Sequence, residues 1–397
     1  MPRFRTSALY ACLLAAAGSL HALPEAQPAV FRAQTIDDRL GIGYGLAIAD
    51  IDGDGKLDIA LVDSKETVWY QAPDWKKHRF TGPLTKQDHV CIAAANIGSK
   101  GGAEVAIGGE WNPGDTRNSG AVFTLIPGED RTAPWTAHEQ HREPTVHRMQ
   151  WVRDPESHPF LAVLPLHGCG NVNGAGDGIR FLGYRPGKEA AEPWSTFLLN
   201  DQFHMAHNFT PVAWPGTAGD SLLVACKEGV HLLRKSDGAG DTPWQAGRLT
   251  EKPAGEVRLG KLPDGKRFIA TIEPMHGNQV AVNPESTTGL WSQKRVLLDD
   301  TLNQGHALAA ADFLGTGYDQ VVAGWREPAG ADKKVGLRLY IPAAEDGSTW
   351  TRHAVIDDNG MACEDLKAAD LNGDGKPDLI ASGRATKNLV IYWNERK

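Results

Sequence analysis

The segment Trp75-Lys-Lys-His-Arg-Phe80 is one of six short stretches that begin with a tryptophan and continue into a basic or apolar run. A seventh copy begins at Phe31, with phenylalanine in place of tryptophan. The remaining copies begin at Trp135, Trp194, Trp244, Trp291 and Trp350. They recur at intervals of about 44 to 60 residues, between short alternating strands, which is typical of propellers and solenoids. The repeat therefore indicates an architecture in which residues distant in sequence share one face.

Each repeat also contains apolar segments upstream of its tryptophan, which gives four expected strands per repeat. The first of these is small and rich in alanine, as expected for strands that crowd around an axis. We expect these inner strands at residues 45–51, 90–96, 148–152, 208–214, 257–262, 307–313 and 366–371. The last repeat ends at its third strand, 389–393, while a spare fourth strand is found at 31–36. The sequence thus predicts an all-β, seven-bladed propeller closed by the N-terminal strand, which removes an exposed edge.

The N-terminus has the pattern of a signal peptide. Arg3 and Arg5 precede an apolar run at 8–17, and Leu20-His-Ala22 is a plausible cleavage site. We expect a signal peptide at 1–22, a single propeller domain at 23–397, and export to the periplasm or the extracellular space. No other segment has the roughly 20 apolar residues of a membrane span. The net charge of −8 argues against nucleic acid as a partner.

Four cysteines follow the signal peptide, and each falls in a different expected blade. We expect them to be free, although an exported protein could pair them. They are Cys91, Cys169, Cys226 and Cys363. Cys169 follows His167 closely and is a candidate ligand.

Two loops between first and second strands carry oxygen side chains at alternate positions around glycines. They read Asp50-Ile-Asp52-Gly-Asp54-Gly-Lys-Leu-Asp58 and Asp370-Leu-Asn372-Gly-Asp374-Gly-Lys-Pro-Asp378. Such spacing suits a hard cation, as in EF-hand loops, so we expect structural calcium at both. The alternative is a bare aspartate and glycine turn. The loops resemble the FG-GAP or VCBS repeats of integrin-like propellers, over nearly the whole mature chain. That resemblance implies calcium that holds loops in place and does no chemistry.

The face opposite these loops collects first-strand starts and second-strand ends. The first-strand starts supply Tyr44, His89, His147, His207, His306 and Glu364. The second-strand ends supply Glu110, His167, Lys227, His276, Arg326 and Arg384. Six of the 14 histidines lie in this set, which is unexpected for a set of ordinary surface residues.

Clustered imidazoles with a carboxylate suit a transition metal, zinc above all. Our preferred ligands are His147, His207 and His276, from three successive blades, followed by His167 and His89. The sequence leaves open which histidines bind metal and which act as bases. Lys227, Arg326, Arg384 and Glu110 either form a solvated rim or hold an anionic or polyhydroxy ligand.

Several phrases on this face are similar to the propeller domain of aldos-2-ulose dehydratase. They are His147-Arg-Met-Gln-Trp151, Pro165-Leu-His-Gly-Cys-Gly170, His204-Met-Ala-His-Asn-Phe209, Glu273-Pro-Met-His-Gly-Asn278, and Gly305-His-Ala-Leu308 with Gly324-Trp-Arg326. The resemblance implies a zinc at the bottom of the cleft and elimination of water from a keto-sugar. That enzyme also has cupin domains for an isomerase step. The present sequence shows none, so we expect the elimination step alone.

Three functions follow as hypotheses. The first is a metal-dependent carbon–oxygen lyase on a carbohydrate, with His306 or His89 as base and Tyr44 or Glu364 as proton donor. Arg326 and Lys227 would orient sugar oxygens. The second is a polysaccharide lyase or glycoside hydrolase on uronic-acid glycans, and the third is a non-catalytic carbohydrate- or protein-binding propeller. The expected partner is a carbohydrate, with no obligate protein partner.

Overall fold

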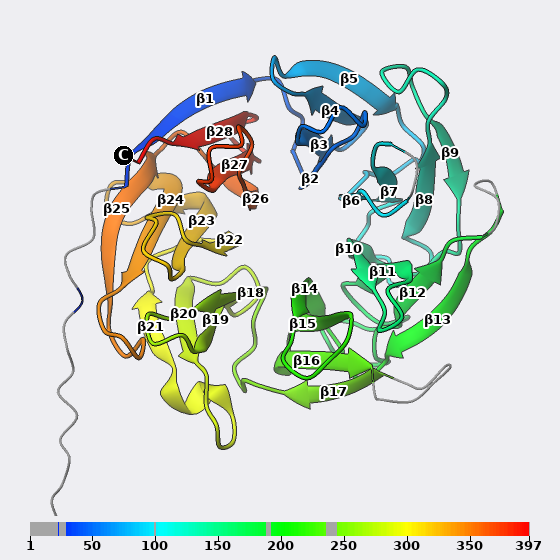
Figure 1. Ribbon diagram of the computed structural model, residues 1–397. Helices are drawn as coiled ribbons and strands as arrows, with labels where there is room; N and C mark the ends of the chain where they lie inside the picture. The colour runs from blue at the N-terminus through cyan, green and yellow to red at the C-terminus, as the bar shows by residue number, and fades with distance from the viewer. Residues whose placement is uncertain (1–22, 24–28, 99–100, 188–191, 236–243, 397) are drawn as a thin grey trace, which may run out of the picture.

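The computed structural model describes residues 23, 29–98, 101–187, 192–235 and 244–396, and contains seven four-stranded antiparallel sheets. The sheets stand as blades around a central axis, with β2, β6, β10, β14, β18, β22 and β26 innermost (Figure 1). The predicted all-β seven-bladed propeller is confirmed. The predicted signal peptide, 1–22, lies outside the described residues.

The strands follow one another from the axis outward in each blade. Blades one to three are β2 (Gly45–Ala49), β3 (Asp58–Val62), β4 (Thr67–Gln71), β5 (Lys76–Thr81); β6 (Cys91–Ala95), β7 (Glu104–Gly109), β8 (Ala121–Ile126), β9 (Thr136–Glu139); and β10 (Val146–Arg153), β11 (Pro159–Pro165), β12 (Phe181–Arg185), β13 (Ser195–Asn200). Blades four and five are β14 (Ala206–Ala213), β15 (Asp220–Cys226), β16 (Gly229–Lys235), β17 (Trp244–Arg248); and β18 (Glu256–Lys261), β19 (Arg267–Glu273), β20 (Gln279–Pro284), β21 (Val296–Asp299). Blade six is β22 (Gly305–Ala311), β23 (Gln320–Ala329), β24 (Lys334–Pro342), β25 (Trp350–Asp358).

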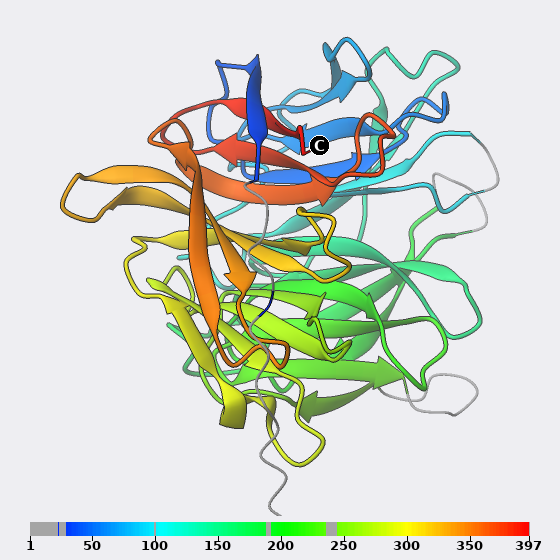
Figure 2. The ribbon, with the colours of Figure 1, turned by 60° about the vertical axis from the view of Figure 1, so that its left-hand side comes forward.

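The seventh blade is built from both ends of the described chain. It contains β26 (Cys363–Ala369), β27 (Asp378–Gly383), β28 (Leu389–Asn394) and β1 (Phe31–Asp37). Strand β1 pairs antiparallel with β28, from Phe31 opposite Asn394 to Asp37 opposite Leu389, and the two run side by side in Figure 1. Figure 2 shows the blue N-terminal strand against the red C-terminal strands. The predicted closure by the N-terminal strand is therefore confirmed. It covers the edge of β28 that would otherwise be free to pair with another chain.

Two of the repeated tryptophan segments bond to the preceding blade through their backbone. The backbone N–H of Trp135 donates to the carbonyl of Phe80 in the preceding blade, and Trp291 donates likewise to Leu249, both at 2.8 Å. At Trp291 the outer strand does not begin with the tryptophan as expected. A single 3₁₀ turn, η1 (Trp291–Lys294), comes first, because the buried indole packs on Trp214 of the preceding blade with ring centroids 5.7 Å apart.

The core lies between blades, so the inner and middle strands are buried on both faces. Strand β3, for example, is buried along its whole length. Within the described ranges, the only helix is the one-turn η1, and none is long and apolar enough to cross a membrane. Cys91, Cys226 and Cys363 are free and buried, and Cys169 is free and exposed.

Candidate metal centre

Four inner strands begin with a β-bulge, and the extra residue of each bulge bears a side chain of the candidate site. The strand register jumps from Val146 to Arg148, from Ala206 to Asn208, from Gly305 to Ala307 and from Cys363 to Asp365. The residues left unpaired are His147, His207, His306 and Glu364. Because a bulge redirects the side chain of its extra residue, four blades present a polar group at one end of the central channel.

His276 reaches the same place from the other direction. It follows β19 in a short turn, in which the N–H of Gly277 donates to the carbonyl of Pro274 at 2.8 Å. Its φ of 53° lies in the left-handed region, which is sparsely populated by residues other than glycine. Such conformations persist only where the surroundings impose them, and they cluster at functional sites.

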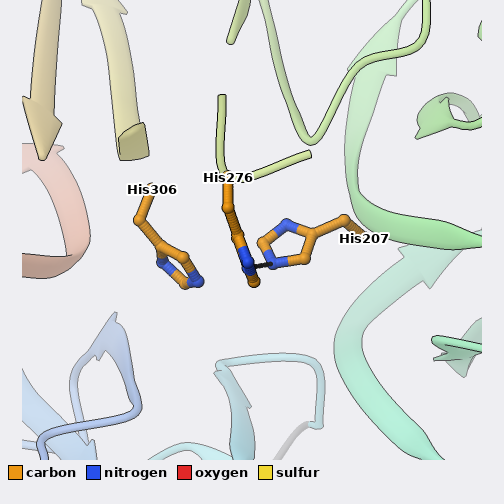
Figure 3. A group of neighbouring side chains, drawn as sticks. All are labelled: His207, His276 and His306. Atoms are coloured by element: carbon orange, nitrogen blue, oxygen red, sulfur yellow. Dashed lines mark hydrogen bonds between the residues drawn. The ribbon is translucent and has the colours of Figure 1, made fainter. Parts of the chain in front are cut away.

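His207, His276 and His306 form one group, in which a ring nitrogen of each lies within 4.8 Å of those of the other two. The Nε2 atoms of His207 and His276 are 2.9 Å apart, and the dashed line in Figure 3 marks this contact. Ring centroids in the triad are 4.7 to 4.9 Å apart. His207 and His306 are 1% and 3% exposed, while His276 is half-buried and closes the group from the outside.

The outer nitrogens of two triad rings are fixed by acceptors. Nδ1 of His207 lies 3.1 Å from both the Gly255 carbonyl and Oε1 of Glu256, and Nδ1 of His306 lies 2.6 Å from the Glu364 carbonyl. With hydrogen on Nδ1, each ring presents the lone pair of Nε2 to the centre. This is the arrangement that metal-ligating histidines normally show.

The third ring differs. Nδ1 of His276 faces Nη2 of Arg326 at 3.3 Å, so it accepts, and Nε2 of His276 then donates to Nε2 of His207. A tetrahedral zinc with bonds of about 2.1 Å would separate ligand nitrogens by about 3.4 Å. The residues therefore fit a transition metal once the proton of His276 moves from Nε2 to Nδ1, away from its contact with Arg326, and the two Nε2 atoms separate by about half an ångström.

Burial keeps these imidazoles neutral. Desolvation lowers the pKa of His276 to about 2, with the nearby His207 and Arg326 acting in the same direction. It also lowers the pKa of His207 and of His306 well below 6.5, with further lowering from Arg148 and Arg326 respectively. A neutral imidazole is the form that binds metal, so the group is prepared for a cation without deprotonation at neutral pH.

Of the three preferred ligands, His207 and His276 lie in the triad, and His306 stands where His147 was expected. Nδ1 of His147 lies 3.0 Å from the His207 carbonyl, and its Nε2 faces Nη1 of Arg148 at 3.1 Å. The ring packs 4.6 Å from the ring of His207, outside the triad. Both nitrogens of His147 are therefore engaged by neighbours.

The predicted substrate-binding arginines surround Glu364. Nη1 of Arg326 lies 3.0 and 3.2 Å from the two carboxylate oxygens, and Nη1 of Arg384 lies 3.0 Å from one of them. The Arg384 guanidinium also lies over the ring of Tyr44, 5.5 Å from its centroid, and the Tyr44 hydroxyl donates to Asp88 at 3.0 Å. Burial raises the pKa of the Tyr44 phenol, and the charge of Asp88 raises it further. These contacts favour a positioning role for Glu364 and leave Tyr44 protonated.

The other predicted residues lie outside the triad. His89 is fully buried, and its Nε2 accepts from the Leu84 backbone N–H at 3.1 Å, while burial lowers its pKa to about 4. Nδ1 of His167 is buried with no hydrogen-bond partner among the described residues. Lys227 donates to the Gly174 carbonyl at 2.8 Å and lines, with His207, a cavity of about 170 Å³. Glu110 accepts from the backbone N–H of Gln87 at 3.4 Å.

The two predicted calcium loops share one internal turn. Asp50 and Asp370 each accept backbone N–H groups three and five residues ahead, at Gly53 and Gly55 and at Gly373 and Gly375. Asp58 and Asp378 each accept two backbone N–H groups that fix the loop base, from Ile51 and Ala72 and from Leu371 and Asn394. In the first loop, Asp50, Asp52 and Asp58 have oxygens within 4.8 Å of one another, while Asp54 accepts the backbone N–H of Lys56. In the second loop, Asn372 and Asp374 each accept a backbone N–H. The turn is thus held by its own backbone, and calcium there stays a prediction.

Sequence reasoning missed Glu256, which is 2% exposed and bonds to His207 and, at 2.7 Å, to Nδ2 of Asn208. Burial raises its pKa, against the lowering effect of Arg258 and Arg148. Glu256 opens the inner strand of the fifth blade, the place that His207 and His306 hold in theirs. Extending the alignment of first-strand starts to this blade would have found it.

Comparison with known proteins supports the fold and goes no further. No known protein family profile matches the chain, and no curated protein sequence matches it. Among solved structures, BBS1N in complex with ARL6DN is similar with a TM-score of 0.56 at 13% identity, over 93% of this chain and 97% of that one. A chain of the mitotic checkpoint complex is similar with a TM-score of 0.55 at 11% identity, over 99% of this chain and 100% of that one. At such identities the similarity establishes the seven-bladed propeller alone.

Proposed function

We propose that this protein is a metal-dependent carbon–oxygen lyase that acts on an oxidised carbohydrate, with a transition metal, zinc above all, held by His207, His276 and His306. The observation that supports the metal is the convergence of three neutral imidazoles from three blades. Two of them are oriented by Glu256 and by the carbonyl of Glu364. Three histidines and one open position are the ligand set of several catalytic zinc sites.

Elimination would pass a proton from the carbon beside a ketone to a water molecule, since His306 is a ligand in this proposal and His89 is fully buried. The carbon–oxygen bond at the next carbon would break, leaving a double bond, and the departing oxygen would take up a proton. The metal would supply Lewis acidity to the ketone oxygen. The chain would supply orientation: Arg326 and Arg384 hold the carboxylate of Glu364, and the carbonyl of Glu364 orients His306. Tyr44, which is protonated and bonded to Asp88, would protonate the departing oxygen. Lys227 would contact substrate oxygens in the cavity that it lines together with His207.

Carbohydrate elimination rests on the resemblance of the histidine phrases to the aldos-2-ulose dehydratase propeller. Export and structural calcium belong to the same proposal, through the expected signal peptide and the FG-GAP-like loops. The competing uronate reading needs arginines that are free to meet a substrate carboxylate. Arg326 and Arg384, the arginines predicted for that role, instead pair with Glu364.

The test is turnover by zinc-loaded mature protein of 2-keto and 3-keto sugars and glycosides, followed by NMR detection of the unsaturated product. Uronic-acid oligosaccharides serve as the competing substrates. His276→Ala should abolish keto-sugar turnover, whereas Lys294→Gln, on the exposed η1 turn, should leave it unchanged. Cleavage of uronides by metal-free protein, or sugar binding without any turnover, would overturn the proposal.

A further inference from the structure

Beneath the histidine triad the central channel widens into a cavity of about 280 Å³. One part of its wall is apolar, from Leu46, Ile48, Ile92 and Ala94 on β2 and β6. The charged members of the lining, Arg148, Arg258, Lys367 and Asp365, come from β10, β18 and β26, where they alternate with apolar and uncharged residues. Three cationic groups face one carboxylate, so the lining itself carries an excess of positive charge.

The single acidic group of the lining is already committed. Both carboxylate oxygens of Asp365 accept hydrogen bonds from Nζ of Lys367, at 2.9 Å each. They also accept the backbone N–H groups of Leu46 and Leu366, both at 2.8 Å. Arg258 is held at the wall by Thr210 at 3.3 Å and by the Val257 carbonyl at 2.7 Å, with Glu256 3.6 Å away. Lys367 and Arg258 thus have partners within the wall, and Arg148 is the remaining cationic group of the lining.

Arg148 has no ion-pair partner among the residues that the structure describes. Its Nη1 contacts Nε2 of His147 at 3.1 Å and the His147 carbonyl at 2.9 Å. Within the described chain, Nε and Nη2 have no protein acceptor, and neither is among the buried unpartnered atoms, so both remain accessible from the cavity that Arg148 lines. A guanidinium with one free edge is a preformed receptor for two parallel hydrogen bonds to a carboxylate.

We propose that the channel binds a small organic anion, with its carboxylate on the free edge of Arg148 and its short hydrocarbon part against the apolar wall of β2 and β6. Arg258, another charged member of the lining, adds long-range attraction. The inference stands on the channel and does not depend on the proposed lyase activity. The guanidinium fork suits carboxylate and phosphate alike, so the apolar wall makes the choice: it favours a carboxylate with methylene groups over both inorganic phosphate and acetate.

The experiment is calorimetric titration of metal-free mature protein with acetate, butanoate and inorganic phosphate at constant ionic strength. We expect one saturable site per chain, with butanoate bound roughly tenfold more tightly than acetate because two further methylene groups are buried. Arg148→Gln should weaken butanoate binding at least tenfold, and Arg148→Lys should weaken it less. Lys294→Gln, which removes one exposed positive charge outside the channel, should bind as the wild type does.

Two further variants separate this site from the triad and from a folding defect. His276→Ala should keep butanoate binding, since the triad takes no part; loss there would place the anion at the histidines and overturn the proposal. If Arg148→Gln is unfolded by circular dichroism, Arg258→Gln replaces it and should weaken binding about threefold or more. Absence of a saturable site, or equal affinity in wild type and a folded Arg148→Gln, would refute the inference.

Discussion

Replacing Glu256 with glutamine tests whether the triad is built for a metal. The side chain is 2% exposed and has both oxygens in use, one 3.1 Å from Nδ1 of His207 and the other accepting from Asn208 at 2.7 Å. Glutamine keeps the size but turns one acceptor into a donor, so either His207 or Asn208 faces another donor. Loss of such an outer partner weakens metal binding about 10- to 100-fold. A buried donor without an acceptor also lowers the free energy of unfolding by about 1 to 3 kcal/mol.

The assay is competition for zinc between the protein and a chromophoric chelator at fixed pH, with unfolding in urea measured in parallel. Glu285→Gln is the matched control, because its carboxylate pairs with Arg267 outside the site. The control should lose stability without loss of zinc affinity. A folded Glu256→Gln protein that binds zinc as tightly as the wild type would refute the claim that Glu256 orients a ligand.

Three further predictions follow from the same contacts. In metal-free protein the free energy of unfolding should fall as the pH drops below 6.5. The reason is that burial lowers the pKa of His276 to about 2, so the unfolded chain binds a proton at this residue before the folded protein does. At pH 5 this residue alone lowers the free energy of unfolding by about 2 kcal/mol. Urea titrations at pH 7.5 and pH 5 measure this loss of stability, and equal stability at the two pH values would contradict the prediction. Asp58, whose pKa burial raises to about 6, acts in the opposite direction. Removing residues 31–37 should leave β28 unpaired and cause self-association with a lower Tm, and an unchanged monomeric variant in light scattering would count against the closure. In mature protein a thiol reagent should modify Cys169 quickly and the buried Cys91, whose pKa burial raises to about 12, only on unfolding; rapid reaction of all four thiols would show that the core is misplaced.

The propeller was predictable because its signals are local and repeated. Apolar strands and the tryptophan segments recur in every blade, and the surplus strand at residues 31–36 had only the unfinished last blade to join. The exception at Trp291 has a tertiary cause. Its indole packs on Trp214 of the neighbouring blade, and the backbone forms a 3₁₀ turn that strand periodicity does not reveal.

The site was predictable as a face but not as a set of contacts. His207 and His276 were expected together and lie together, with Nε2 atoms 2.9 Å apart. His147 and His306 occupy the same bulged position in their strands, and what separates them is the environment of their ring nitrogens. The guanidinium of Arg148 engages Nε2 of His147, whereas Nε2 of His306 has the Glu364 carboxylate near it at 4.0 Å, beyond hydrogen-bond distance. Such a difference depends on rotamers in neighbouring blades, which no spacing in the sequence encodes.

The pairing of Arg326 and Arg384 with Glu364 was hidden for the same reason. Each residue alone suggests contact with substrate, since it stands at the rim of the histidine face. Only the folded ring brings two guanidinium groups from blades six and seven onto one carboxylate. Glu256 was missed because the fifth blade has glutamate where the fourth and sixth have histidine.

The most direct test of the metal centre is the transition-metal content of purified mature protein after mild chelation, measured by elemental mass spectrometry. We predict one zinc or similar ion per chain in the wild type and in His147→Ala, and none in His207→Ala, His276→Ala or His306→Ala. A protein that retains no transition metal, or one that loses it in His147→Ala while keeping it in His306→Ala, would contradict the assignment of His207, His276 and His306 as the metal ligands.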